Sequence, residues 1–192
     1  MLRGRKFLIS MICFSIFAST ISSYAEEEIK KCSYAEDEIE DLIDIAESKS
    51  KIIAIIEGRK TITSDLRSNE KVLWSGSNGY LGAFLTDLRF FVISTSLDAW
   101  QALPLRSDES GQGVASLSAY IALLVTRDRA IGFDAASNRF VETRFPIQDE
   151  LVAAEAEKCV AVVITSSRAF GLATETSAFT EIRLRGRETI ET

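Results

Sequence analysis

Four arginines recur along this sequence in similar surroundings, and their guanidinium groups are the best candidates for ligand chemistry. Arg89, Arg129 and Arg168 each follow a threonine by three residues, and Arg59 falls at the same place in a weaker upstream copy. A guanidinium group binds carboxylate, phosphate or sulfate through paired N–H donors. If the repeated units surround an axis, the four arginines form a ring that holds a small anion. The alternative is that each arginine packs against or bridges to the neighbouring unit, because repeat positions commonly serve stacking.

Two other patterns suggest catalysis but have simpler explanations. Glu142 and Glu181 recur at one place in two copies, and paired carboxylates hydrolyse glycosides, yet both alternate with apolar residues as on the solvated face of a strand. Ser48 and Lys51 have a serine–lysine spacing, but they precede an apolar run and have no partner motif, as in a polar turn. We therefore predict no catalytic residue and a non-enzymatic protein, with a carboxylate-dependent enzyme acting on glycans as the alternative.

The absence of histidine narrows the chemistry further. The chain has no histidine and three cysteines, which excludes Ser-His-Asp and Cys-His arrangements and leaves too few ligands for a zinc site. No close spacing of oxygen ligands suggests a calcium loop. We expect neither a metal nor a cofactor.

A repeat of about 40 residues organises the chain. Three copies begin GAFLTDLRFFVIS, IALLVTRDRAIGFD and VAVVITSSRAFGLA. The aromatic residues Trp100, Phe140 and Phe179 each follow the arginine of their copy by 11 residues. A degenerate fourth copy is placed upstream at KIIAIIEGRKTIT, followed by EKVLW, with Arg59 at the arginine position. A fixed length between matching residues implies a fixed geometry.

Each copy is predicted to consist of short strands. Continuous apolar runs precede two-residue turns, the length of a tight hairpin. In the strand that follows, small residues alternate, as Gly132 and Gly171 illustrate, so that one face is bare and another backbone can approach it. A third strand alternates apolar and charged residues. The segments 114–120 and 150–159 are candidates for a fourth strand.

Four short antiparallel strands per 40 residues resemble the blades of β-propeller proteins across residues 39–192, without a tryptophan-aspartate or kelch signature. The resemblance implies an all-β fold of about four repeats, arranged as a small propeller-like ring of antiparallel hairpins. The alternatives are a β-sandwich and an open repeat array completed by oligomerisation.

The first 25 residues have the pattern of a cleavable signal peptide. A basic start is followed by an apolar run over 7–22, and small residues two apart, Ser23 and Ala25, close it. We predict cleavage after Ala25, export to the periplasm or the medium, and no membrane span after cleavage. Residues 26–38 form an acidic leader, and the β-repeat domain covers 39–192.

Two cysteines remain in the exported chain, and an oxidising compartment favours their pairing. We predict a disulfide between Cys32 and Cys159, with two free thiols as the alternative. The bridge would close a loop of more than 100 residues, which the loop-entropy model values at about 4 to 5 kcal/mol. A ring would bring the two cysteines together, because they lie at opposite ends of the repeats.

Charge restricts the partners. The net charge is −6, and cleavage of the signal peptide removes three basic residues, so attraction to nucleic acid or an anionic membrane is not expected. The sequence therefore predicts an exported binding or scaffold module that recognises a protein, a glycan or a small anionic ligand. A subunit whose incomplete ring is finished by a second copy of itself is a further alternative.

Overall fold

The computed structural model describes residues 40–58, 60–109, 113–174, 176 and 178–184, and these contain fifteen strands and no helix. The predicted all-β class is confirmed. The signal peptide, the acidic leader, Cys32 and Arg59 lie outside the described residues, so the predictions that rest on them remain predictions.

The strands form four antiparallel sheets in which each strand pairs with its neighbour in the chain. Sheet 1 has three strands and the other three sheets have four. Sheet 1 comprises β1 (Ile43–Glu47), β2 (Lys51–Ile56) and β3 (Lys60–Asp65); sheet 2 comprises β4 (Val72–Asn78), β5 (Leu81–Thr86), β6 (Arg89–Ser94) and β7 (Gln101–Pro104); sheet 3 comprises β8 (Val114–Leu117), β9 (Ile121–Val125), β10 (Arg129–Asp134) and β11 (Arg139–Arg144); sheet 4 comprises β12 (Leu151–Glu157), β13 (Val160–Thr165), β14 (Arg168–Ala173) and β15 (Thr180–Arg183).

The predicted repeat is confirmed for sheets 2 to 4, with one correction to the upstream copy. In sheet 1 the Ser48 hydroxyl contacts the main chain of Lys51, as Thr126 contacts Arg129 in sheet 3. The N–H of Leu66 donates to Ser50 as that of Phe145 donates to Asp128. Lys51 therefore holds the arginine position in sheet 1, so the upstream copy is aligned on Ser48 and Lys51; Arg59 itself lies outside the described residues. The EKVLW segment leads into β4 of sheet 2 and is not a third strand of the first unit.

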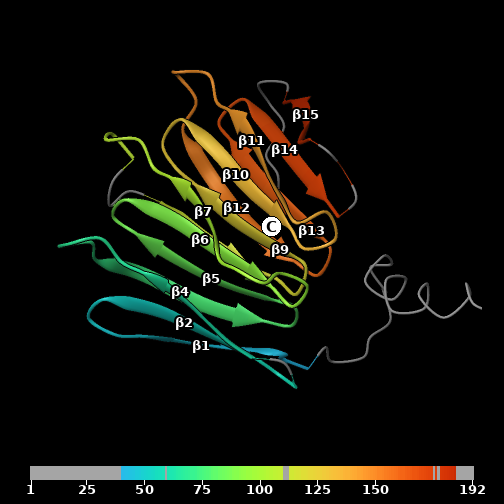
Figure 1. Cartoon of the computed structure of the whole chain (residues 1–192). Coiled ribbons are helices and arrows are strands. Elements are labelled where there is room, and N and C mark those ends of the chain that lie inside the picture. The colour runs from blue at the N-terminus through green and yellow to red at the C-terminus, as the bar shows by residue number, and fades with distance from the viewer. Residues whose placement is uncertain (1–39, 59, 110–112, 175, 177, 185–192) are drawn as a thin grey trace, which may run out of the picture. The chain divides into compact units, whose positions relative to one another are not determined.

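Successive sheets pack face to face in chain order, and Figure 1 shows this order as a colour change from the blue strands of sheet 1 to the red strands of sheet 4. Ile93 of sheet 2 is buried with Ala54 of sheet 1, and Phe133 of sheet 3 is buried with Val92 of sheet 2. Leu172 of sheet 4 belongs to a core cluster with Leu123 of sheet 3. Within the described residues no core cluster joins sheet 1 to sheet 4. The sheets form an open series, not a two-layer sandwich.

The bare strand face predicted from the glycines is the face on which the next sheet packs. A Cβ at Gly132 in β10 would overlap the Cδ2 of Leu172, and the Phe179 ring would lie 3.3 Å from it. Glycine is needed here because the next sheet approaches so closely. The recurrent aromatic residues also pack in the core, as shown by the edge-on contact of Trp100 with the Phe84 ring at 5.5 Å between centroids.

Polar contacts complete the join between sheets 3 and 4. The Ser118 hydroxyl donates to the carbonyl of Lys158 at 2.7 Å, and the hydroxyl of Ser116 accepts from the N–H of Ala156 at 2.9 Å. The two serine hydroxyls satisfy a main-chain carbonyl and a main-chain N–H at the contact between the sheets. Main-chain polar groups that are buried between two sheets need such partners. They fix the register of one sheet on the next.

Candidate functional site

The threonine that precedes each recurrent arginine closes a hairpin. The hydroxyls of Thr86, Thr126 and Thr165 lie within hydrogen-bond distance of the carbonyl of the arginine three residues later, at 3.0, 3.2 and 3.1 Å. In the second sheet the Thr86 hydroxyl also accepts from the N–H of Arg89 at 2.8 Å. A side-chain oxygen thus satisfies the main chain of a turn that has no asparagine or glycine. The recurrence of threonine in the sequence has a structural cause.

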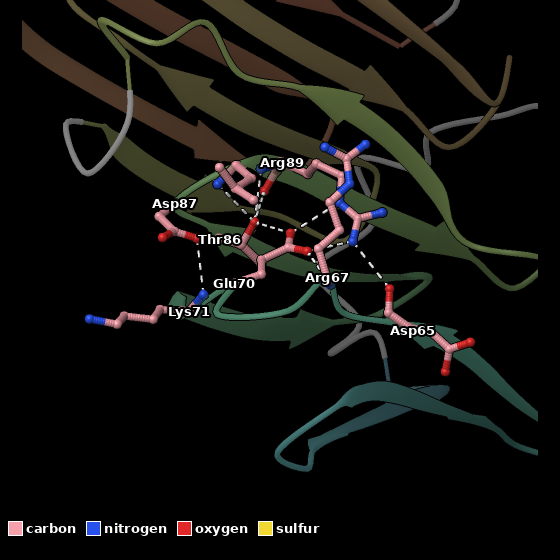
Figure 2. A network of polar contacts seen from close by, with 8 residues as sticks. Asp65, Arg67, Glu70, Lys71, Thr86, Asp87 and Arg89 are labelled. Atoms are coloured by element: carbon pink, nitrogen blue, oxygen red, sulfur yellow. Dashed lines mark hydrogen bonds and ion pairs between the residues drawn. The ribbon is translucent and has the colours of Figure 1, made fainter.

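Figure 2 shows that in sheet 2 the arginine and the threonine converge on one carboxylate, that of Glu70. The Nε of Arg89 donates to Oε1 at 3.0 Å and a terminal nitrogen donates to Oε2 at 2.5 Å, while Thr86 donates to Oε1 at 2.6 Å. The Glu70 side chain is fully buried. Arg89 also donates to the carbonyl of Asp65 in sheet 1 at 3.1 Å. The network therefore binds the ends of two strands of sheet 2 to the preceding sheet.

Sheet 3 repeats this network in a more buried form. Arg129 makes two bonds of 2.6 Å to Glu109, and Thr126 donates to the same carboxylate at 3.0 Å. A third bond from Arg129, also 2.6 Å, reaches Glu142 on the neighbouring strand β11. The Arg129 side chain is 5% exposed. Two carboxylates thus hold one buried guanidinium, the arrangement that offsets the cost of burying a charge.

Sheet 4 departs from the pattern at the carboxylate. Asp149 stands where sheets 2 and 3 have glutamate, and it accepts from the hydroxyls of Thr165 and Ser167. Arg168 binds Glu181 on the adjacent strand β15. Its side chain is 25% exposed, more than those of Arg89 and Arg129. Among the described recurrent arginines, Arg168 is consequently the one most accessible to a ligand.

The networks shift the pKa values of their members. Burial by itself raises the pKa of Glu70, but hydrogen bonds from Arg89, Thr86 and the N–H of Arg67 outweigh burial and lower the pKa to about 2. The pKa of Glu109 is lowered to about 2 by the balance of burial against bonds from Arg129, Arg106 and Thr126. The hydrogen bonds that Arg129 donates to Glu109 raise the pKa of Arg129. All three groups are therefore charged at neutral pH.

The arginines of the predicted ring are thus distributed over separate sheets. Arg89 and Arg129 bind a glutamate in the connection that leads into their sheet, and Arg168 binds Glu181 on the adjacent strand. This arrangement accounts for their recurrence by packing, and the anion ring remains a prediction, with Arg59 outside the described residues. Cys159 is buried at the turn between β12 and β13. Its bridge to Cys32 remains a prediction because Cys32 is not described. The described residues contain no cluster of acidic or cysteine side chains that would hold a metal ion.

Sequence reasoning missed the two buried glutamates, Glu70 and Glu109, although a signal for them exists. Each ends a segment of the same kind, LRSNE at 66–70 and LRSDE at 105–109, and the two segments lie 39 residues apart. The N–H of the arginine in each segment donates to the glutamate carboxylate at 2.8 Å. The segment lies in a connection between sheets, where a search for strand patterns does not look.

An open groove of about 590 Å³ lies where sheet 3 meets the connection to sheet 4. Its apolar lining includes Ile147, which is 99% exposed, and the partly exposed Val114 and Leu151. Arg127 and Glu150 supply charges of opposite sign. Exposed apolar side chains around a concave surface are typical of a binding site.

Replacement of the hairpin threonine tests the network. We expect Thr86→Val to lower the free energy of unfolding by about 1 to 3 kcal/mol, because Glu70 and the N–H of Arg89 lose a buried partner. Thr63→Val on the exposed side of β3 is the matched control, and we expect it to leave stability within about 0.5 kcal/mol. Urea denaturation followed by circular dichroism measures both. Equal effects of the two variants would contradict a special role for Thr86.

Comparison with known proteins adds distant structural neighbours. No protein-family model and no curated protein matches the sequence. The chain is similar to PorZ, described as a surface component of the type-IX secretion system of Porphyromonas gingivalis, at 11% identity and a TM-score of 0.44, over 77% of this chain and 20% of that one. It is also similar to the N-terminal domain of Nup159, at 11% identity and a TM-score of 0.35, over 77% of this chain and 45% of that one. Hsv2 of Kluyveromyces marxianus matches at 12% identity and a TM-score of 0.34, over 60% and 38% of the two chains. The chain spans between a fifth and about half of these proteins.

Among the described residues no helix is long and apolar enough to cross a membrane.

Proposed function

We propose that this protein is an exported, non-enzymatic binding module that holds a segment of a partner protein in the groove between sheets 3 and 4. The observation that carries the proposal is the exposure of Ile147 at the edge of that groove. Burying an isoleucine side chain against a partner contributes about 1.5 to 3 kcal/mol. The groove has room for several side chains of a bound segment.

The repeated networks support this proposal by making the groove rigid. Thr126, which lines the groove, donates to Glu109 inside the buried network of sheet 3. Asp149, on the opposite wall, binds Thr165 of sheet 4. Walls held by such bonds lose little conformational entropy when a ligand binds, which favours affinity. In this proposal the recurrent charged residues serve as scaffold, and the loops between sheets serve as the recognition surface.

A small anion is a second ligand to consider, and the geometry restricts it to one arginine. Arg168 is the most exposed of the recurrent arginines in the part of the chain that the structure describes, and within that part it makes an ion pair only with Glu181. An anion would have to displace Glu181 from it, whereas at Arg129 it would have to displace two carboxylates from a buried site. Titration with sulfate, followed by the NMR shifts of Arg168, tests this second ligand.

The enzymatic alternative requires Glu142 and Glu181 to act on one glycosidic bond. They lie on equivalent strands of two different sheets, and each binds the arginine of its own sheet. Both carboxylates thus have a structural partner, and this favours the binding module.

A peptide selection tests the proposal. Random twelve-residue peptides displayed on phage would be selected on the immobilised protein, and the enriched peptides measured by fluorescence anisotropy. We expect Ile147→Asp to weaken their binding at least about tenfold, which corresponds to 1.4 kcal/mol. Leu88→Asp, at an exposed turn of sheet 2, is the matched control and should leave binding unchanged. No enrichment, or equal effects of the two variants, would overturn the proposal.

A further inference from the structure

The contact between successive sheets repeats with the same register along β2, β6, β10 and β14, the strands that begin at the arginine position of each unit. The fifth residue of β6, Ile93, is buried with the fourth residue of β2, Ala54. The fifth residue of β10, Phe133, is buried with the fourth residue of β6, Val92. In the next pair the contact is direct, because Leu172 of β14 fills the space above Gly132 of β10. Each sheet thus inserts one apolar side chain over a matching position of the sheet before it.

This register leaves one position open at the sheet 4 end of the series. Gly171 in sheet 4 is equivalent to Gly132, but among the described residues no atom lies within 4 Å of a Cβ built on it. Beside it, Val160 and Val162 are 39% and 42% exposed. Their equivalents in sheet 3 are Ile121 and Leu123, which are fully buried. The outer face of sheet 4 therefore has the apolar character of a face that another sheet covers.

The sheet 1 end of the series presents the opposite half of the same contact. Ile55 is the fifth residue of β2, the position that Leu172 holds in sheet 4, and it is 51% exposed. Ile53 stands at the position of Phe170, which is buried against sheet 3. Sheet 1 thus carries the inserting side chains and has no preceding sheet among the described residues to receive them.

We propose that sheet 4 of one copy of this chain packs on sheet 1 of a second copy, with Ile55 of the second copy entering the space over Gly171. The contact is head-to-tail, because the two faces lie at opposite ends of the series in Figure 1. Two copies that each offer both faces close into a ring with two equal contacts, and if the rotation does not close, the contact continues into a longer assembly. A second copy fits better than an unrelated partner because the two free faces match each other in the register that joins the sheets within the chain.

Asp44 makes this contact weaker than the contacts within the chain. Asp44 is the second residue of β1. The second residue of the equivalent strands β5, β9 and β13 is small, namely Gly82, Ala122 and Ala161. A Cβ on Gly82 would lie 2.8 Å from Ile45 and 3.1 Å from Ile43 of the preceding sheet. Sheet 1 has Asp44 at this position, so its carboxylate would face Val162 and Val160 of the other copy. Removing a carboxylate from water against valine side chains is unfavourable, and the association is therefore reversible.

Sedimentation velocity over a range of concentrations, on protein purified from cells that express the full chain, tests the proposal. We expect concentration-dependent association, and we expect Asp44→Ala to lower the dissociation constant by about tenfold or more. Gly171→Leu should abolish association, because the added side chain occupies the space that Ile55 enters. Ile147→Asp, in the groove of the proposed function, should leave association unchanged.

A second variant separates loss of association from loss of folding. Gly171→Ala should leave the melting temperature unchanged, because a Cβ at that position contacts nothing within the described chain. Gly132→Ala should lower it, because Leu172 occupies the equivalent space. A chain that stays monomeric even with Asp44→Ala, or an oligomer that Gly171→Leu does not disrupt, would overturn the proposal. Neither result bears on the groove, since the inference does not rest on the proposed function.

Discussion

Replacing Glu109 by alanine should lower the free energy of unfolding by about 3 to 5 kcal/mol, which is a large part of the stability of a single domain. The variant leaves the guanidinium of Arg129 buried, at 5% exposure, with only Glu142 as a charged partner. It also removes the acceptor of the Thr126 hydroxyl and of the N–H of Arg106. Stability falls because a buried charge loses its partner and two donors lose their acceptor, so the decrease exceeds that caused by removing a methylene group.

Urea denaturation of three variants identifies the cause of this loss. Glu142 is the outer partner of the same arginine, and its side chain is 37% exposed. We therefore expect Glu142→Ala to lower the free energy of unfolding much less than Glu109→Ala does. The double variant Glu109→Leu with Arg129→Met replaces the buried pair by apolar side chains, and we expect it to recover most of the stability. If the double variant were as unstable as Glu109→Ala, the packing of the glutamate and not its charge would explain the loss.

The second large effect is the response to acid. Glu70 and Glu109 each have a pKa of about 2 in the folded chain, below the value of about 4.3 for an unfolded glutamate. Because the folded pKa values are the lower ones, the stability that these groups contribute is complete above about pH 5 and is lost as the pH falls toward 2. A shift of this size corresponds to about 3 kcal/mol for each group, as an order of magnitude.

Thermal melts between pH 7 and pH 2 measure this contribution. We expect the stability of the unchanged protein to fall steeply between about pH 4.5 and pH 2. Glu70→Gln combined with Glu109→Gln should be less stable at pH 7 and should have a flatter pH dependence in that interval. Asp65→Asn, at an exposed carboxylate of sheet 1, is the control and should keep the steep dependence. A double variant with the same slope as the unchanged protein would contradict the role of these two carboxylates.

The resemblance to blade repeats predicted the fold class better than it predicted the equivalence of individual residues. Thr86, Thr126 and Thr165 were aligned correctly, because each closes a hairpin whose length is fixed by a two-residue turn. The upstream copy was misplaced because Ser48 and Lys51 replace the threonine and the arginine there. Serine retains the hydroxyl that the hairpin needs, and only the hydrogen bonds of the turn reveal the equivalence.

The arginines were identified as a recurrent feature, but their partners were not. Their nearest carboxylates in space, Glu70 and Glu109, lie 19 and 20 residues away in the chain. Spacing along the sequence carries little information about such a pair, because it forms only when the connection between sheets folds back on the hairpin. The groove near Ile147 was missed for the same reason, since one of its walls comes from sheet 3 and the other from the connection to sheet 4.

The sequence alone determined the all-β class, the repeat of about 40 residues and the need for a small residue at Gly132, because hydrophobic alternation, turn length and glycine placement are local properties of a chain. Tertiary structure decided which carboxylate neutralises each arginine, which faces of the sheets stay uncovered, and that sheet 1 does not meet sheet 4 within the described residues. These features depend on the twist and stacking of whole sheets. Stacking is set by the combined packing of many side chains, and no single segment encodes it.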